Sequence, residues 1–212
     1  MKKFDRLPPQ QRREEIQQAA LALFCEKGFA ATTMENIVER VSLSKGGVYR
    51  LYPSTLAILQ DLMLEGMRLR NAYYEACTRR QIEAGGPLTL GFLVEMIGDS
   101  LLLYPQVSAV YVEFLWEKQH SPPLEALYQQ ICAQSVQETA ALMQRYGADK
   151  LLTGHASLRT LTELMNAAVL SLRVLHLQDY FAAHKAEICG AITRTLEENT
   201  WNTIDKGDAD HA

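Results

Sequence analysis

Residues 32–53 are the stretch that most constrains the fold of this 212-residue chain, because they have the pattern of two short helices joined by a tight turn. Thr32 is the predicted N-cap of the first helix, and Glu35 stands three residues later, at the spacing of a capping box. Ser44 is the predicted N-cap of the second helix, which ends before Pro53. Two helices in this arrangement form a helix-turn-helix, whose second helix can enter the major groove of DNA.

The second helix of this pair opens with two glycines, Gly46 and Gly47, directly after Lys45. A glycine inside a helix costs roughly 1 kcal/mol relative to alanine, so two of them need a reason. One reason is a close approach of the backbone to the wall of a groove, since glycine has no side chain. The alternative is a plain loop, but the apolar residues that follow continue at helical spacing and favour the helix.

Lys45, Tyr49 and Arg50 are predicted to lie on the outward side of the same helix. A tyrosine hydroxyl suits a phosphate oxygen, and a lysine or arginine suits a phosphate or a guanine edge. Each of them alone is most often an ordinary solvated side chain, but three of them beside two glycines favour contact with DNA. The predicted DNA-contacting residues are Thr33, Ser44, Lys45, Gly46, Gly47, Tyr49, Arg50 and Tyr52.

Residues 10–60 resemble the N-terminal domain of the TetR family of bacterial transcriptional regulators. The matching pieces keep their spacing without gaps and are Arg13-Glu14-Glu15-Ile16, Ala19-Ala20, Leu23-Phe24, Lys27-Gly28-Phe29, Thr32-Thr33-Met34, Ile37, Ser44-Lys45-Gly46, Val48-Tyr49, Tyr52-Pro53-Ser54 and Leu59. The resemblance implies an all-helical homodimer whose C-terminal domain senses a small molecule and releases DNA. Repression is the usual mode of regulation in this family.

The sequence departs from the family pattern in three places. Ser42 stands where members commonly have glycine, Leu51 where they often have histidine, and Thr55-Leu56 where a Lys-Glu pair is frequent. By that pattern the lysine touches a DNA phosphate, and this chain has no lysine there. These departures can weaken or re-aim DNA binding, but they leave the motif in place.

The charge of the chain is uneven along its length. The whole sequence has a formal net charge of −4, which is unusual for a nucleic-acid binder. Residues 1–54 hold 9 Lys and Arg against 6 Asp and Glu, a net charge of +3, and residues 55–212 hold 12 against 19, a net charge of −7. The basic charge therefore lies in the part of the chain that is predicted to meet phosphate.

Composition and spacing disfavour several other classes of protein. An apolar share of 48% supports a sizeable core, and no apolar run approaches the ~20 residues that span a bilayer. The chain lacks a secretory signal, which predicts a cytoplasmic location and reduced cysteines. The four cysteines are far apart and lack the spacing of a zinc site, so we expect no metal and no cofactor. Cys25 and Cys132 fall in apolar surroundings and are expected in the core.

Almost the whole chain has helical periodicity, so we predict an all-α fold. A helix over residues 9–27 completes an N-terminal three-helix bundle, and a long helix over residues 54–84 follows the helix-turn-helix. Further helices are expected over residues 88–103, 105–119, 123–146, 157–177 and 179–199. The predicted domains are a helix-turn-helix DNA-binding domain over residues 10–60, a helical ligand-binding and dimerisation domain over residues 61–200, and a frayed tail over residues 201–212.

The family resemblance implies a small apolar or amphipathic ligand, and the segment between residues 92 and 143 is rich in aromatic residues and methionine. The candidate ligand-binding residues are Phe92, Met96, Tyr104, Tyr111, Trp116 and His120. Aromatic residues on helices are more often part of a core, so the pocket is favoured by the resemblance and not by these residues. Ligand binding is expected to tilt the helix over residues 54–84 and to change the spacing of two recognition helices.

The last two predicted helices have apolar stripes that suit an interface between two copies of the chain. The candidate interface residues are Leu161, Leu164, Ala168, Leu172, Ile188 and Ile192. By the resemblance these helices form a four-helix bundle in a homodimer, whereas the alternative is that they bury only the core of one subunit. DNA geometry favours the dimer, because a two-fold dimer reads an inverted-repeat operator with half-sites about 34 Å apart, or a multiple of that.

Two rival functions remain open on the sequence. An enzyme is disfavoured, because His120, His155, His176 and His184 are scattered, without a nucleophile or a metal pattern nearby. The second rival is a helical protein-interaction module whose helix-turn-helix does not bind DNA. A steep dependence of binding on salt would identify DNA binding, since phosphate contacts release counterions.

Overall fold

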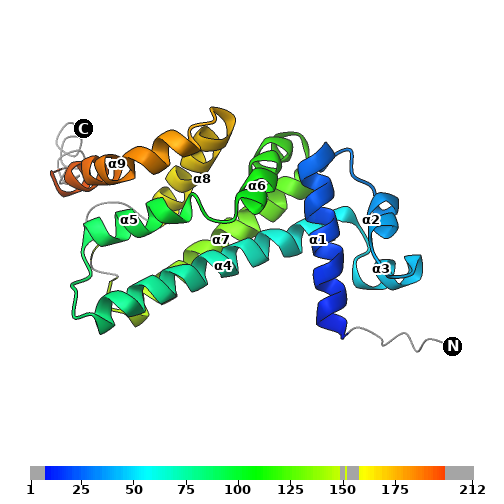
Figure 1. The fold of residues 1–212 in the computed structure, drawn as a ribbon, viewed down its shortest axis with the longest axis horizontal. Coiled ribbons are helices and arrows are strands. Elements are labelled where there is room, and N and C mark those ends of the chain that lie inside the picture. Colours follow the sequence, from blue (N-terminus) through cyan, green and yellow to red (C-terminus); the bar gives the residue numbers. More distant parts are fainter. Residues whose placement is uncertain (1–7, 149–150, 152–157, 199–212) are drawn as a thin grey trace, which may run out of the picture. The chain divides into compact units, whose positions relative to one another are not determined.

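The structure is a computed structural model that describes residues 8–148, 151 and 158–198 (Figure 1). Its elements are α1 (Pro9–Lys27), α2 (Met34–Arg40), α3 (Lys45–Leu51), α4 (Thr55–Glu83), α5 (Leu90–Ser100), α6 (Pro105–Glu117), the short 3-10 helix η1 (Lys118–His120), α7 (Pro122–Arg145), α8 (Leu158–Val174) and α9 (Gln178–Glu198). The described residues contain helices and no strand, which confirms the predicted all-α fold. The predicted tail over residues 201–212 lies outside the described residues.

Local signals in the sequence set the ends of several helices. Pro9 begins α1, where its missing N–H costs no helical hydrogen bond. Gly28 follows α1 with a φ of 88°, a conformation that glycine adopts without a steric penalty. The long helix α4 begins at Thr55, after Ser54, whose hydroxyl accepts a hydrogen bond from the N–H of Ala57 at 3.2 Å.

The N-cap of α2 is Thr33, so the prediction of Thr32 is wrong by one residue. The Thr33 hydroxyl accepts from the N–H of Asn36 at 3.3 Å, and the Asn36 side chain accepts from the N–H of Thr33 at 3.0 Å. The capping box therefore uses Asn36 in place of Glu35. Thr32 is buried instead, and its hydroxyl donates to the carbonyl of Gly28 at 2.7 Å, closing the turn after α1.

Contacts divide the chain into two compact units, and helices α4 and α7 contribute to both. Unit 1 comprises Met1–Met67 and Tyr104–Ile131, and unit 2 comprises Arg68–Leu103 and Cys132–Ala212. Helix α6 therefore clusters with the N-terminal helices. The predicted domain boundary at residue 60 falls inside α4 and stays a prediction.

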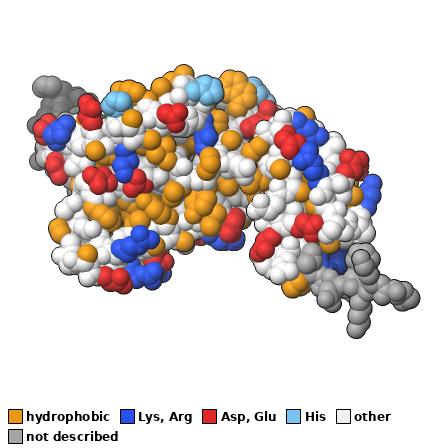
Figure 2. Space-filling model, in the orientation of Figure 1, with side chains coloured by type: hydrophobic (Ala, Val, Ile, Leu, Met, Phe, Trp, Pro, Cys, Tyr) orange, Lys and Arg blue, Asp and Glu red, His pale blue; other side chains and the backbone are white. Residues whose placement is uncertain are grey.

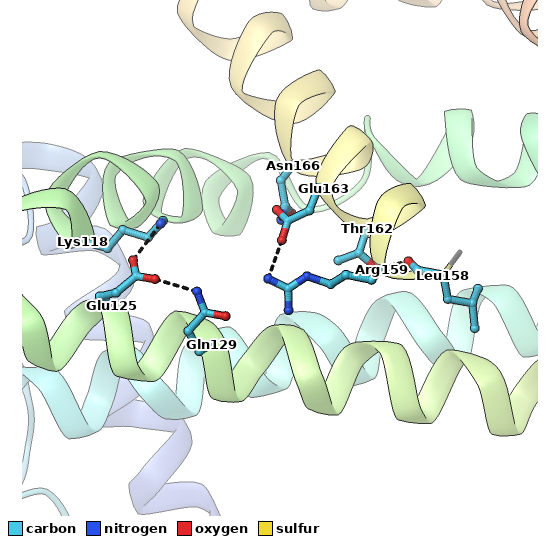
Figure 3. A network of polar contacts seen from close by, with 8 residues as sticks. All are labelled: Lys118, Glu125, Gln129, Leu158, Arg159, Thr162, Glu163 and Asn166. Carbon is cyan, nitrogen blue, oxygen red and sulfur yellow. Dashed lines mark hydrogen bonds and ion pairs between the residues drawn. The ribbon is translucent and has the colours of Figure 1, made fainter. Parts of the chain in front are cut away.

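The core of unit 1 joins α1, the helix-turn-helix, the start of α4 and α6. Its fully buried side chains include Ile16, Phe24, Ile37, Val48, Ile58 and Phe114. Helix α6 is also tied to the loop between α1 and α2, because Glu113 accepts from the N–H of Phe29 at 2.5 Å. At the end of the unit, Lys118 of η1 donates to Glu125 of α7, which also accepts from Gln129 (Figure 3).

In unit 2, helix α5 lies beside α9 (Figure 1). Leu90 and Val94 of α5 pack against the buried Cys189 of α9, and Lys185 of α9 forms an ion pair with Asp99. A second cluster of buried side chains joins α4 to α5 and consists of Tyr74, Leu93 and Met96. These contacts give unit 2 a core of its own.

Two expectations about exposure can be compared with the structure. Cys132 is buried as predicted, but Cys25 is exposed, because its position on α1 lies away from the buried stripe of Ile16, Ala20 and Phe24. In the described part of the chain, no single helix is long and apolar enough to cross a membrane.

Candidate functional site

Helix α3 includes Gly46 and Gly47 in its first turn. This confirms the prediction of a helix at these glycines, and the alternative of a plain loop is wrong. Its N-cap, Ser44, accepts from the N–H of Gly47 at 3.2 Å. A Cβ on Gly47 would lie 3.3 Å from the Ser44 hydroxyl, so this glycine makes room for the cap. A Cβ on Gly46 would meet nothing within 4 Å, so this glycine leaves a flat and open surface at the start of the helix.

Two outward side chains of α3 share one carboxylate. Lys45 Nζ lies 3.2 Å from Glu35 Oε1, and the Tyr49 hydroxyl donates to the same oxygen at 3.0 Å. The bond from Lys45 is the largest cause that holds the pKa of Glu35 below its ordinary value. Lys45 and Glu35 are 65% and 57% exposed, so an anion from solution can compete for the lysine and the phenol.

Arg50 and Thr33 complete the exposed part of the predicted DNA-contacting set. Arg50 lies on the surface of α3, and no described residue forms an ion pair with it. Thr33 is exposed beside the turn, although its hydroxyl serves the capping box of α2. The structure thus brings a lysine, a tyrosine and an arginine to the surface of one short helix.

Tyr52 is 2% exposed and is no surface residue, so its predicted contact with DNA is corrected. Its hydroxyl donates to Asp61 at 2.7 Å and accepts from Gln17 at 3.0 Å, and the guanidinium of Arg13 lies 5.1 Å from its ring centre. Burial, followed by the hydrogen bond to Asp61, raises the pKa of Tyr52 to about 12. As the C-cap of α3, Tyr52 turns toward α1 and α4 and fixes the recognition helix against them.

Glu15 is a supporting residue that the sequence patterns do not indicate. It lies on α1, and its two carboxylate oxygens accept from the N–H and the hydroxyl of Ser42, at 2.5 and 3.0 Å. Ser42 stands in the turn between α2 and α3, so this pair holds the turn against α1. The serine at this position, which departs from the family pattern, therefore has a partner in the fold.

Unit 2 contains a mainly apolar cavity of about 90 Å³. Its lining comes from α4, α5, α7, α8 and α9, and the residues are Arg70, Tyr74, Thr78, Leu90, Leu93, Val94, Met96, Ile97, Ser135, Thr139, Leu142, Met143, Tyr146, Ala148, Leu158, Leu161, Thr162, Met165 and Leu196. Figure 3 shows that the Thr162 hydroxyl donates to the carbonyl of Leu158, and it does so at 2.8 Å. A mainly apolar cavity with a few polar groups suits a small molecule.

Only Met96 of the six candidate ligand-binding residues lines this cavity. Phe92 packs against the neighbouring cluster of unit 2. Tyr104, Tyr111, Trp116 and His120 belong to unit 1, where Tyr111 meets the buried Phe114 with ring centres 6.0 Å apart. Trp116 is 63% exposed, and His120 is exposed as well. Close spacing in sequence does not bring these residues together, because successive positions of a helix face different directions.

The predicted interface residues of α8 and α9 divide into two groups. Leu164 and Ile192 are exposed, at 60% and 44%, which suits contact with a partner. Leu172 is buried within the subunit, and Leu161, which is half-buried, lines the cavity. The half-buried side chains are those of Ala168 and Ile188. Figure 2 shows hydrophobic side chains gathered over the visible face of unit 2.

Comparison with known proteins first concerns the segment that includes the helix-turn-helix. Residues 16–62 match the model of the family described as bacterial regulatory proteins, tetR family. The uncharacterized HTH-type transcriptional regulator YfiR of Bacillus subtilis (strain 168) is 39% identical over 56 residues, which make up 26% of this chain and 27% of that relative. The chain thus matches about a quarter of the length of this curated relative.

Solved structures extend the likeness to the whole fold. Salmonella enterica GusR aligns with a TM-score of 0.66 and 20% identity, over 89% of this chain and 94% of that one. Thermus thermophilus FadR, a TetR-family transcriptional repressor solved in complex with lauroyl-CoA, aligns with a TM-score of 0.55 and 22% identity, over 88% of this chain and 94% of that one. These structures share the all-helical fold with the chain.

The described chain is an all-α fold that begins with a capped helix-turn-helix, and proteins with this segment or this fold are described as transcriptional regulators. The segment that matches the tetR family of bacterial regulatory proteins covers α2 and α3 together with parts of α1 and α4. The family model and the curated relative are both described as regulators.

Proposed function

We propose that the chain is a sequence-specific DNA-binding regulator that acts as a homodimer and releases its operator when a small molecule binds. The observation that carries the proposal is the exposed surface of α3, where Lys45, Tyr49 and Arg50 stand together within the segment that matches the family model. Exposed cationic and phenolic groups of this kind bind phosphate and base edges. The proposed DNA-contacting residues are Thr33, Ser44, Lys45, Gly46, Gly47, Tyr49 and Arg50.

The carboxylate of Glu35 supports this assignment. It engages Lys45 and Tyr49 through one oxygen in the free protein, which shows that the two side chains converge on a single anionic atom. A DNA phosphate oxygen has the same charge and the same capacity to accept these two hydrogen bonds. We infer that phosphate takes the place of Glu35 when the operator binds.

Dimerisation is proposed through the exposed faces of α8 and α9. Leu164 and Ile192 are exposed there, and the further large apolar side chains that are more than half exposed on these helices or between them are Val174, Leu175 and Tyr180. A subunit gains free energy by burying such a surface against an identical one. Two recognition helices would then read an inverted repeat, and a regulator of this kind acts in the cytoplasm, where bacterial DNA is found.

Helix α4 supports a proposal for ligand-dependent release. It follows the recognition helix after Pro53, and its later residues Arg70, Tyr74 and Thr78 line the cavity of unit 2. A ligand in the cavity would act on the same helix that positions α3. Coupling of about 1–3 kcal/mol between two such sites changes operator affinity from several-fold to about a hundredfold. Repression follows the mode stated for the FadR relative.

The test is a binding selection of the purified full chain against random duplex DNA, at fixed and near-physiological salt. We expect enrichment of an inverted repeat by the wild type and its loss in Lys45→Ala and Tyr49→Ala. Arg79→Ala is the control. Arg79 is exposed on α4 in unit 2, so this substitution removes one positive charge without changing α3. If the ligand-free wild type enriches no sequence, the alternative of a protein-interaction module takes over.

A further inference from the structure

The cavity of unit 2 has one charged residue among the described residues that line it, and that residue is Arg70. The remaining walls are mostly aliphatic side chains and methionines, among them Leu93, Met96 and Met165. Charged groups that lie inside proteins are normally paired, because taking a charge out of water is unfavourable. An arginine at an apolar cavity without a carboxylate therefore needs another partner.

The hydrogen bonds of Arg70 leave the guanidinium partly unsatisfied. Its Nη2 donates to the hydroxyl of Ser135 at 2.6 Å, and Ser135 is a neutral residue that is itself 5% exposed. The Nε atom of Arg70 is buried and has no hydrogen-bond acceptor among the described residues. The serine thus fixes one end of the guanidinium, and no carboxylate of the described residues forms an ion pair with Arg70.

Three other polar groups around the cavity already have partners. The Tyr74 hydroxyl lies 2.9 Å from the Ser100 hydroxyl, and the Thr162 hydroxyl donates to the carbonyl of its own helix. The Tyr146 hydroxyl donates to Glu75 at 3.3 Å. Arg70 is therefore the polar group with most capacity left for a ligand, and it is a donor that carries a positive charge.

We propose that the cavity binds a small organic acid, whose carboxylate pairs with Arg70 and whose apolar body packs against Leu93, Met96 and Met165. A planar carboxylate matches the guanidinium in charge and in geometry, and a single cation balances a monoanion better than a phosphate dianion. This inference rests on the proposed function, since it names the class of ligand to which the regulator would respond.

The volume of the cavity connects ligand binding to a change in the protein. At about 90 Å³ the cavity is smaller than the cavity of about 150 Å³ that is known to accept benzene in another protein. A six-membered ring or a longer alkyl chain would therefore displace the helices that surround the cavity. Since α4 is one of them, an organic acid of this size can alter the position of that helix.

The experiment compares ligands of one shape and different charge by isothermal titration of the full-length protein. Hexanoate is compared with hexanamide and hexylamine, and benzoate with benzamide. We expect each carboxylate to bind more tightly than its amide, by a factor on the order of ten, and the amine to bind least. Equal affinities for carboxylate and amide, or no binding of any of these probes, would overturn the proposal.

Variants of two arginines on α4 distinguish a specific ion pair between Arg70 and the ligand carboxylate from an effect of the net charge of the protein. Arg70→Gln should remove the preference for the carboxylate while hexanamide still binds, which shows that the cavity is intact. Arg70→Lys should keep part of the preference, and Arg79→Gln should keep all of it, because Arg79 is exposed outside the cavity. A preference that survives in Arg70→Gln would overturn the assignment.

The selection of DNA by the ligand-free protein distinguishes failure of the proposed ligand class from failure of the proposed DNA-binding function. Enrichment of an operator without a preference for carboxylates overturns this inference and leaves the proposed function intact. A preference for carboxylates that depends on Arg70, without enrichment of any operator, supports the site and contradicts the DNA-binding function.

Discussion

At the scale of single residues, Glu35 and Tyr52 show how one short helix can serve two purposes. Glu35 holds Lys45 and Tyr49 together on the outer side of α3. Tyr52 holds the inner side of the same helix through Asp61 and Gln17. The outer contacts are exposed and exchangeable, whereas the inner ones are part-buried around the buried Tyr52 and fix the helix.

The first prediction concerns Glu35. Glu35→Gln should increase operator affinity a few-fold, because Lys45 and Tyr49 no longer have to exchange a carboxylate for phosphate and because one negative charge near DNA is removed. Fluorescence anisotropy with the selected operator measures this change. Glu39→Gln is the matched control on the same helix, since it changes the charge equally and Glu39 is exposed. Equal gains in the two variants would show that only the net charge matters.

A pair of tyrosines provides the second prediction. Tyr52→Phe should lower the free energy of unfolding by about 1–3 kcal/mol, because Asp61 and Gln17 lose a buried partner. The operator sequence it selects should not change. Tyr49→Phe should do the reverse and weaken operator binding with little change in stability, because its hydroxyl is on the surface. Urea denaturation and anisotropy on both variants check this crossed pattern.

At the scale of secondary-structure elements, the sequence indicated what depends on neighbouring residues and missed what depends on distant ones. The stop at Gly28, the cap at Ser44 and the helical state of Gly46-Gly47 are local, and they were predictable. The shift of the α2 cap by one residue was not, because Thr32 is drawn inward by packing. The place of Arg70 in the cavity depends on Ser135, 65 positions away, and no local pattern indicates it.

Glu113 is the basis of the third prediction, because it joins α6 to the loop before α2. A Cβ at Gly28 would come within 2.6 Å of its carboxylate, so the loop and the glutamate fit closely. Glu113→Ala should lower stability by about 1–3 kcal/mol, since the N–H of Phe29 loses its acceptor. Glu113→Gln keeps an acceptor for that N–H and should be much less destabilising. Thermal unfolding of both variants gives the comparison.

The raised pKa of Glu113 leads us to expect that stability depends on pH. Burial raises the pKa of Glu113 above its ordinary value of 4.5, against the lowering effect of the Phe29 N–H. The folded state therefore holds this proton more tightly than the unfolded chain. Stability from this group is full below pH 4.5 and is lost as the pH rises through the raised pKa. Relative to Glu113→Gln, the wild type should lose stability over that range, and a difference that does not change with pH would contradict the assignment.

At the scale of the whole molecule, charge and apolar surface are segregated along the chain. The first 54 residues have a net charge of +3, and the remainder has a net charge of −7. The large apolar side chains that are more than half exposed on α8, on α9 and between them are those of Leu164, Val174, Leu175 and Tyr180. Binding DNA needs positive charge, whereas binding a second copy needs exposed apolar surface, and the chain has these two properties on different helices.

The last prediction joins these two properties. Leu164→Glu should shift the protein toward monomers in sedimentation velocity, because a charge would be buried in the proposed interface. A monomer contacts one half-site, so the slope of log Kd against log salt concentration should fall to about half of the wild-type slope. Trp116→Glu is the control, since Trp116 is 63% exposed but lies on α6 in unit 1. If Leu164→Glu leaves both the sedimentation and the salt slope unchanged, the dimer must form through another surface, while the DNA contacts of α3 would keep their assignment.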